Sequence, residues 1–189
     1  MMTWLPGGWL DGVRHLSSLN FGERPAACPV SLVVIHNISL PPEQFGGEWV
    51  EDFFTNRLDA SAHPYFAEIA DLQVSAHFYV RRDGQIVQFV GCDDRAWHAG
   101  RSCWQGRDNC NDYSVGIELE GSDFQPFESV QYAALWPLLN ALLARYPITD
   151  LAGHSDVAPG RKTDPGPFFD WSTLRRRYPG LRLPSEIVG

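Results

Sequence analysis

The sequence predicts an α/β domain in which a central mixed β-sheet is flanked by helices. Two observations lead to this fold class. An apolar, β-branched run over residues 30–37 is typical of a central strand that is covered on both faces. A helical recurrence of apolar residues over 129–145 indicates a long amphipathic helix. Because strand and helix signals are interspersed, we expect one layered domain that spans residues 1–189.

The first predicted strand carries His36 and Asn37 at its end. A loop rich in proline and glycine follows it. Two short helices are then predicted, at 49–58 and 63–72. Residues 40–72 therefore form an insertion before the next strand, and this insertion is long enough to wall a pocket.

A β-hairpin is predicted around the Asp83-Gly84 dipeptide. This dipeptide favours a tight turn, and it separates two strand-like segments, 74–81 and 85–90. We expect these two segments to pair as antiparallel strands.

The segment 115–120 reads VGIELE and is predicted to be a further strand. Successive side chains of a strand point to opposite faces, so Ile117 and Leu119 share one face. Glu118 and Glu120 share the other. We expect a strand with one apolar and one polar side.

The helix predicted over 129–145 has Ser129 as a candidate N-cap. Pro137 should kink this helix without ending it. A brief strand at 151–154 and a loop rich in glycine and proline follow. The last predicted helix lies near 171–178.

Composition and charge argue against several classes of function. The net charge of −8 over 189 residues would repel a nucleic-acid backbone, so we expect no nucleic-acid partner. No apolar run approaches the length of a membrane span, and the N-terminus lacks the pattern of a secretory leader. We therefore expect a cytoplasmic protein with no membrane partner and no obligate protein partner. The four cysteines form no C-x-x-C pair and are expected to be reduced thiols.

The densest group of chemically active side chains lies in the segment 153–166, GHSDVAPGRKTDPG. His154 and Asp164 can share a ligand only through loop geometry, with a third group arriving from elsewhere, for which His36 is a candidate. Two imidazoles and one carboxylate suit Zn²⁺ and leave a position for water, whose pKa the metal lowers. Spacing alone cannot select His36 from six histidines, because a lone histidine is more often a surface or core residue.

Five segments of the chain resemble the AmpD-type 1,6-anhydro-N-acetylmuramyl-L-alanine amidases. They read LVVIHNISLPP, VSAHFYVRRDGQIVQFV, RAWHAG, CNDYSVGIELEG and GHSDVAPGRKTDPG. The similarity runs from about residue 8 to residue 171. It implies the N-acetylmuramoyl-L-alanine amidase-like fold, which peptidoglycan-recognition proteins share: a mixed sheet with helices on its faces and zinc in a surface groove. The implied fold agrees with the fold class predicted above.

The resemblance also implies a role for each of five residues. His36, His154 and Asp164 would be the Zn²⁺ ligands. Glu118 would be the general base, which takes a proton from water and returns it to the leaving amine. Lys162 would stabilise the oxyanion that develops on the carbonyl.

Alternatives to these assignments exist among neighbouring residues. Strand alternation cannot choose Glu118 over Glu120, because both share a face, so the choice rests on the family pattern. Glu120 is then expected to be a structural partner. Asp156 is a less favoured alternative to Asp164, because it can form a turn with nearby backbone N–H groups. His77 is expected to be a core histidine rather than a ligand.

Four residues are expected to bind substrate: Asn37, Trp97, His98 and Arg107. Ordinary core packing is an equal alternative for Trp97, and a solvated surface position is the alternative for Arg107. Relatives often carry further arginines where this chain has Gln73 and Asn109. Contacts with the peptide are therefore expected to be weaker or differently built here.

The activity that these features imply is zinc-dependent hydrolysis of the amide bond between 1,6-anhydro-N-acetylmuramic acid and L-alanine in muropeptides. The implied partner is a small-molecule substrate, and the implied process is peptidoglycan recycling. Two alternatives are a non-catalytic peptidoglycan-recognition module and an amidase that acts on intact cell wall.

Overall fold

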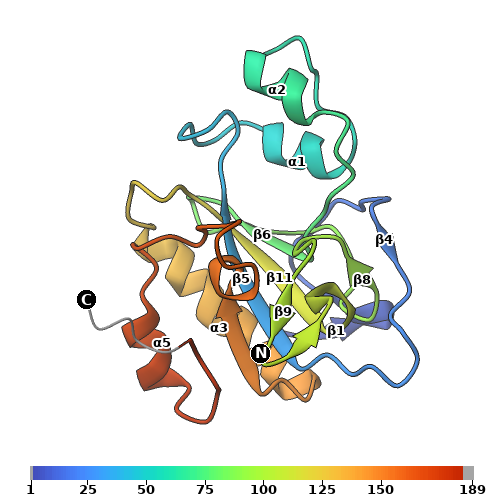
Figure 1. Cartoon of the computed structure of the whole chain (residues 1–189), viewed down its shortest axis with the longest axis vertical. Coiled ribbons are helices and arrows are strands. Elements are labelled where there is room, and N and C mark those ends of the chain that lie inside the picture. Colours follow the sequence, from blue (N-terminus) through green and yellow to red (C-terminus); the bar gives the residue numbers. More distant parts are fainter. Residues whose placement is uncertain (1, 185–189) are drawn as a thin grey trace.

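A six-stranded mixed sheet forms the centre of the computed structural model, of which residues 2–184 are described (Figure 1). Its spatial order is β12 (Asp150–Gly153), β5 (Leu32–Ile38), β11 (Ser114–Glu120), β6 (Phe78–Val80), β7 (Ile86–Gln88) and β3 (Arg14–His15). The first four strands run parallel to one another, β7 is antiparallel to β6, and β3 is parallel to β7. With helices packed around this sheet, the predicted fold class is confirmed.

Smaller elements surround the central sheet. The helices are α1 (Trp49–Phe54), α2 (Pro64–Ile69), α3 (Ser129–Arg145), α4 (His154–Val157) and α5 (Trp171–Arg177), with 3₁₀ turns η1 (Pro6–Gly8) and η2 (Cys110–Asp112). Three antiparallel strand pairs complete the fold: β1 (Trp4–Leu5) with β2 (Trp9–Leu10), β4 (Phe21–Gly22) with β8 (Arg95–Ala96), and β9 (Cys103–Trp104) with β10 (Arg107–Asp108). Within residues 2–184, no helix is long and apolar enough to cross a membrane.

One face of the central strands packs against α3. Val33 and Ile35 of β5 and Ile117 of β11 are fully buried in one apolar cluster with Leu135 and Leu139 of α3. Removal of this apolar area from water is the main favourable term that holds the helix on the sheet. The opposite face is therefore free to carry polar side chains at the carboxyl ends of the parallel strands.

Helix α3 has the predicted bounds, but its predicted cap is wrong. The N-cap is Glu128, and Ser129 is the first helical residue. Glu128 and Gln131 form a capping box, in which the Glu128 backbone N–H donates to Gln131 Oε1 at 2.9 Å. The helix continues through Pro137.

Several other elements are shorter than the sequence predicts. Helix α1 ends two residues before Asn56, whose φ of 58° is incompatible with a right-handed helix. Helix α2 begins at Pro64, a residue suited to the first helical position. The strand predicted to include His154 ends at Gly153, because the Asp156 carboxylate accepts the Gly153 N–H at 2.7 Å and starts the turn α4.

The polar side of β11 is not a solvent face, since all seven residues of the strand are buried. Glu120 accepts hydrogen bonds from the backbone N–H of Gly46 and, at 2.8 Å, from that of Arg82. These bonds join the loop before α1 to the turn of the β6–β7 hairpin. Glu120 is therefore the structural partner that the sequence analysis expected.

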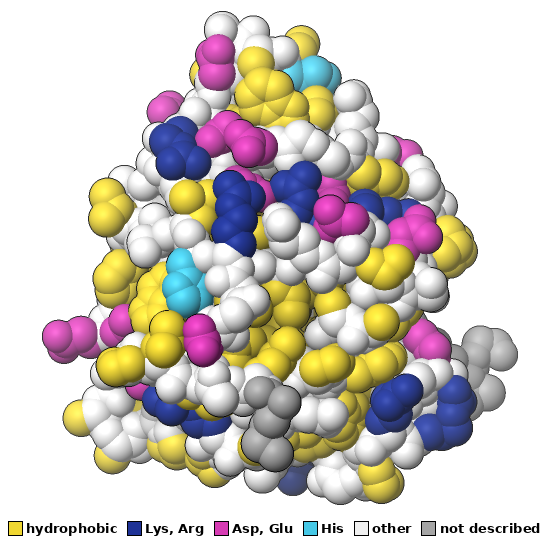
Figure 2. Space-filling view, turned by 180° about the vertical axis from the view of Figure 1, so that it is seen from behind, with side chains coloured by type: hydrophobic (Ala, Val, Ile, Leu, Met, Phe, Trp, Pro, Cys, Tyr) yellow, Lys and Arg dark blue, Asp and Glu magenta, His cyan; other side chains and the backbone are white. Residues whose placement is uncertain are grey.

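A buried ion pair also holds the insertion to the sheet. Glu51 of α1 is only 1% exposed, and its two oxygens lie 2.6 Å from Arg14 Nη1 and 2.6 Å from Arg81 Nη1. A carboxylate in this position requires such partners, because burial without them is costly. Across the middle of the face drawn in Figure 2, basic and acidic side chains likewise lie beside one another.

His77 is a buried core histidine, as predicted. Its Nδ1 accepts the Gly116 N–H at 3.0 Å, and its Nε2–H donates to the Asp94 carbonyl at 3.2 Å, so the neutral ring is fully bonded. Burial, together with a smaller effect of the charge of Arg24, lowers the pKa of His77 to about 3. Protonation would require the loss of the bond from Gly116.

The depressed pKa of His77 predicts a pH-dependent stability. Between pH 6.5 and pH 3, His77 is protonated in the unfolded chain but stays neutral in the folded chain. The free energy of unfolding therefore falls as the pH falls. From pH 7 to pH 5 this histidine should account for about 2 kcal/mol. Denaturant titrations of metal-free wild type and His77→Asn should show a loss smaller by this amount in the variant. Equal losses of unfolding free energy in the two proteins would contradict the low pKa of His77. Between pH 7 and pH 8 the free energy of unfolding should change with pH by the same amount in both proteins.

Candidate active site

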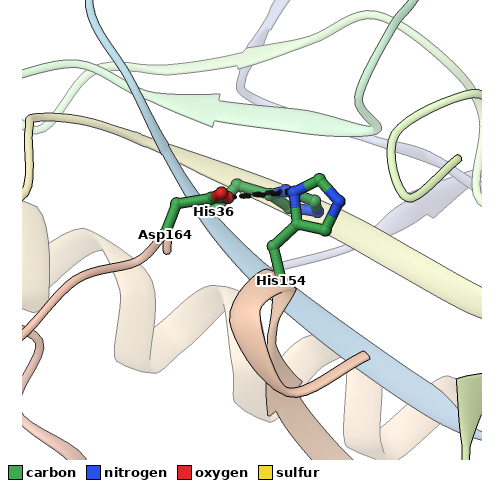
Figure 3. A group of neighbouring side chains, drawn as sticks. All are labelled: His36, His154 and Asp164. Atoms are coloured by element: carbon green, nitrogen blue, oxygen red, sulfur yellow. Dashed lines mark hydrogen bonds and ion pairs between the residues drawn. The ribbon is translucent and has the colours of Figure 1, made fainter. Parts of the chain in front are cut away.

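Three side chains from separate segments converge at the carboxyl ends of β5 and β12 (Figure 3). His36 lies within β5, His154 follows β12 as the first residue of α4, and Asp164 lies in the loop after α4. The two Nδ1 atoms of the histidines are 2.9 Å apart. Asp164 Oδ2 lies 3.2 Å from Nδ1 of His36 and 3.1 Å from Nδ1 of His154. The three residues that the sequence analysis grouped are thus brought together.

The protons of the two histidines lie on the outer nitrogens, so the nitrogens that face the centre of the cluster carry lone pairs. His154 Nε2 lies 3.2 Å from the Ala99 carbonyl, which can only accept, so the proton is on Nε2 and Nδ1 carries a lone pair. When His36 donates from Nε2 to His98 Nδ1 at 3.0 Å, its own Nδ1 is also bare. Two lone pairs and one carboxylate oxygen then face a common point. A cation at that point could accept electron density from all three atoms.

The pKa values of the cluster agree with this distribution of protons. Burial, together with a smaller effect of the neighbouring His154, lowers the pKa of His36 to about 4. Burial opposes the charge of Asp164, yet its close contacts with His154 and His36 hold its pKa well below the ordinary value. A neutral imidazole and an ionised carboxylate are the forms that bind metal.

The dimensions fit a tetrahedral metal ion. Ligand atoms about 2.0–2.2 Å from such an ion lie roughly 3.3–3.6 Å from one another. The 2.9 Å to 3.2 Å separations require only a small outward movement of the three side chains. Among the described residues, this is the group of His, Cys, Asp and Glu side chains whose ligand atoms converge closely enough to hold a metal.

His98 stands behind His36 and connects it to the sheet. Its Nδ1 faces His36 Nε2, and its Nε2 lies 3.1 Å from Ser114 Oγ. The ring can pack against β11 at Gly116 because this residue has no side chain: a Cβ there would be 2.5 Å from His98 Cγ. Asn111 Oδ1 accepts the backbone N–H of His98 at 3.2 Å. His98 is therefore placed to orient the ring of His36.

Replacing His98 with alanine should weaken Zn²⁺ binding by about 10–100-fold, the range typical for loss of a group that orients a ligand. His36 would lose its partner at Nε2, so its ring would be free to rotate. Competition with a chelator measures this affinity directly. His63→Ala, which alters a histidine of the insertion, is the control and should bind Zn²⁺ as the wild type does. Equal affinities in wild type and His98→Ala would refute the orienting role.

Glu118 pairs in register with His36 and points to the same side of the sheet. Its Oε1 is 3.9 Å from His36 Nδ1, and its Oε2 is buried without a hydrogen-bond partner. Burial raises the pKa of Glu118 well above its ordinary value, and the charge of Asp164 raises it further, whereas Lys162 lowers it. An unpartnered carboxyl oxygen beside a cluster that can hold a metal has the position and the basicity to take a proton from water.

A cavity of about 420 Å³ opens beside the cluster. The insertion supplies an apolar wall, formed by Leu40, Phe53, Phe54, Tyr65, Ile69 and Leu72. The strand ends and the loops that follow them supply a polar wall, formed by Asn37, Glu118, Ser122, Asp123, His154, Lys162 and Asp164. In Figure 1 the helices α1 and α2 stand over the end of the sheet as a cap. The expectation that the insertion walls a pocket is confirmed.

The remaining predicted residues divide into two groups. Asn37, Trp97 and His98 line the cavity, as does the exposed Lys162. Arg107 does not. Its guanidinium carbon lies 3.8 Å from the centroid of the Tyr113 ring, and its Nη2 lies 2.8 Å from Cys28 Sγ. Neither Gln73 nor Asn109 lines the cavity either.

Sequence reasoning missed three residues that shape the site: Asn111, Ser114 and Asp123. The first two lie in CNDYSVGIELEG, a segment that carries the resemblance, so that segment held a signal for them. Asp123 follows the segment by two residues, and its only signal was a polar side chain just after a strand. Its contacts become visible only in three dimensions.

The fold and the site define a hydrolase with a His/His/Asp cluster that can hold a metal and with an adjacent carboxylate. The family model described as N-acetylmuramoyl-L-alanine amidase matches residues 26–167, and the chain belongs to this family of amidases. The 1,6-anhydro-N-acetylmuramyl-L-alanine amidase AmpD of Citrobacter freundii is 53% identical over 173 residues, or 90% of this chain and 92% of that protein. AmpD of Escherichia coli K12 is also 53% identical over 173 residues, which cover 90% of this chain and 94% of that protein.

Solved structures agree with this assignment. A crystal structure of a selenomethionine AmpD derivative superposes with a TM-score of 0.89 at 53% identity and covers 92% of this chain and 98% of its own. The amidase AmiD of E. coli, solved with anhydro-N-acetylmuramic acid-L-Ala-D-γ-Glu-L-Lys, gives a TM-score of 0.59 at 32% identity. That match covers 92% of this chain and 65% of the AmiD chain.

Proposed function

We propose that this protein hydrolyses the amide bond between the lactyl group of 1,6-anhydro-N-acetylmuramic acid and L-alanine in muropeptides, with Zn²⁺ as its cofactor. The observation that carries the proposal is near full-length similarity, 53% over 90% of this chain, to amidases named for that bond. The converging His36, His154 and Asp164 supply the donor set that the chemistry needs. The complex of AmiD with an anhydromuramyl peptide supports a ligand of this class.

Zn²⁺ held by His36, His154 and Asp164 would supply Lewis acidity, which makes water more acidic and polarises the carbonyl. The protein's own groups carry the proton and the charge. Glu118 accepts a proton from the attacking water at its unpartnered Oε2 and delivers it to the nitrogen of L-alanine as the C–N bond breaks. Lys162 offsets the negative charge that develops on the carbonyl oxygen.

The two walls of the cavity suit the two halves of such a ligand. The apolar wall from the insertion can exclude water from the reacting bond and pack against the sugar or peptide. The polar wall can hydrogen-bond the amide groups. A cytoplasmic role in peptidoglycan recycling is part of the same proposal.

Rates on two substrates test the proposal. Purified protein should release free peptide from 1,6-anhydro-muropeptides much faster than from intact sacculi. Faster release from sacculi would instead indicate an amidase of the intact wall. Binding of muropeptide without any release, in protein shown by elemental analysis to contain Zn²⁺, would indicate a non-catalytic recognition module.

A further inference from the structure

The side chain of Asn37 is held by a carboxylate on the neighbouring loop. Asn37 lies on β5 directly after the metal-ligand candidate His36, and it lines the cavity. Its Nδ2 donates to Asp123 Oδ1 at 2.7 Å. Asp123 also lines the cavity, from the loop that follows β11. The two residues thus form a polar pair on the wall opposite the insertion.

The pair fixes which end of the Asn37 amide faces outward. The two ends of an asparagine amide are similar in shape, so the amide can rotate by half a turn unless a partner selects one orientation. An ionised carboxylate accepts hydrogen bonds and cannot donate them, so only the NH₂ end can face Asp123. Among the described residues, no group donates to Asn37 Oδ1. This carbonyl oxygen is left as an acceptor at the cavity wall.

Asp123 is itself fixed on its other side. Ser122 and Gln125 form a β-bridge across the turn that contains it. The Cβ that any other residue would have at Gly166 would lie 2.5 Å from Asp123 Oδ1 and 3.0 Å from its Cα. Gly166 comes two residues after Asp164. The Asp123 carboxylate is therefore packed between Asn37 and the loop that carries Asp164.

We propose that Asp123 is a positioning residue. It holds Asn37 so that Oδ1 accepts a hydrogen bond from a peptide N–H of the muropeptide, next to the bond that is cut. The inference rests on the proposed function and adds a specific requirement to it. The peptide of the substrate donates a hydrogen bond to Asn37 Oδ1, and Asp123 sets the orientation of that oxygen. Loss of Asp123 leaves Asn37 in place but lets its NH₂ end turn toward the substrate, where two donors would then meet.

Three variants test the pair by kinetics on a 1,6-anhydro-muropeptide. Asp123→Asn keeps the shape but no longer selects the orientation of Asn37, so KM should rise about tenfold while kcat changes little. Asn37→Asp places two carboxylates face to face and should lower kcat/KM more severely. The reversed pair, Asn37→Asp with Asp123→Asn, restores both the internal bond and an outward acceptor oxygen. Its kcat/KM should recover to within a few-fold of the wild type.

Zn²⁺ content and melting temperature, measured for every variant, separate this role from a structural one, and both should stay at the wild-type value in Asp123→Asn. A wild-type KM in Asp123→Asn, or a reversed pair no better than Asn37→Asp alone, would overturn the inference while leaving the proposed function intact. Asp123→Ala is a second test of the same role, because it removes the carboxylate that selects the orientation of the Asn37 amide and adds no donor. This variant should also raise KM. A wild type that does not turn over the muropeptide would overturn the proposed function and this inference together.

Discussion

Replacing His154 with alanine should remove bound Zn²⁺ and lower kcat/KM by about 10³-fold or more. The cluster would keep only His36 and Asp164, and two protein ligands do not hold a catalytic zinc firmly. The metal's charge stabilisation is worth several kcal/mol in the transition state, which corresponds to this loss in rate. Elemental analysis and steady-state kinetics on a 1,6-anhydro-muropeptide measure the two effects.

Asp156→Asn is the matched control for this prediction. Asp156 lies two residues after His154, and the sequence left it as an alternative ligand. Its carboxylate accepts the Gly153 N–H at 2.7 Å, a bond within its own turn. The variant should therefore retain stoichiometric Zn²⁺ and most of its activity. Loss of Zn²⁺ in Asp156→Asn but not in His154→Ala would contradict the ligand set.

Replacing Glu118 with glutamine should lower kcat by about 10²- to 10⁴-fold, the contribution typical of a general base. The amide keeps the shape of the side chain but cannot accept the proton. Because Glu118 Oε2 has no hydrogen-bond partner, the substitution breaks no bond at that atom. Zn²⁺ content should stay at the wild-type value, which distinguishes this loss from the loss of a ligand.

Glu120→Gln is the control for the neighbouring position on the same face of β11. Glu120 accepts hydrogen bonds from Gly46 and Arg82 and holds the insertion in place. We expect this variant to lower the melting temperature while kcat remains near the wild-type value. Full turnover by Glu118→Gln would show that another group takes the proton.

The long, periodic elements could be predicted from the sequence, and the short ones could not. The apolar recurrence over 129–145 gave both ends of α3, and the β-branched run gave most of β5. Three pairs of two-residue strands went unpredicted, because two residues carry no periodicity. The cap of α3 was misplaced by one residue, because a glutamate cap that bonds Gln131 is less common than a serine cap.

The site shows a similar division between what patterns reveal and what packing decides. The loop around His154 and Asp164 stood out by composition, but His36, 118 residues away from His154, was selected only by family resemblance. The position of Arg107 against the Tyr113 ring follows from how the β9–β10 pair packs, which no local pattern encodes. The pairing of Asn37 with Asp123 depends on two loops that meet only in the folded chain.

Hydrolysis in ¹⁸O-labelled water tests the central claim most directly. Protein stripped of metal and then reloaded with Zn²⁺ is given a 1,6-anhydro-muropeptide, and the products are weighed by mass spectrometry. The account predicts that one ¹⁸O enters the lactyl carboxylate of the anhydro sugar, that the peptide is released unlabelled with a free L-alanine amine, and that stripped protein is inactive until Zn²⁺ returns. Label in the peptide, or undiminished cleavage by the stripped protein, would contradict it.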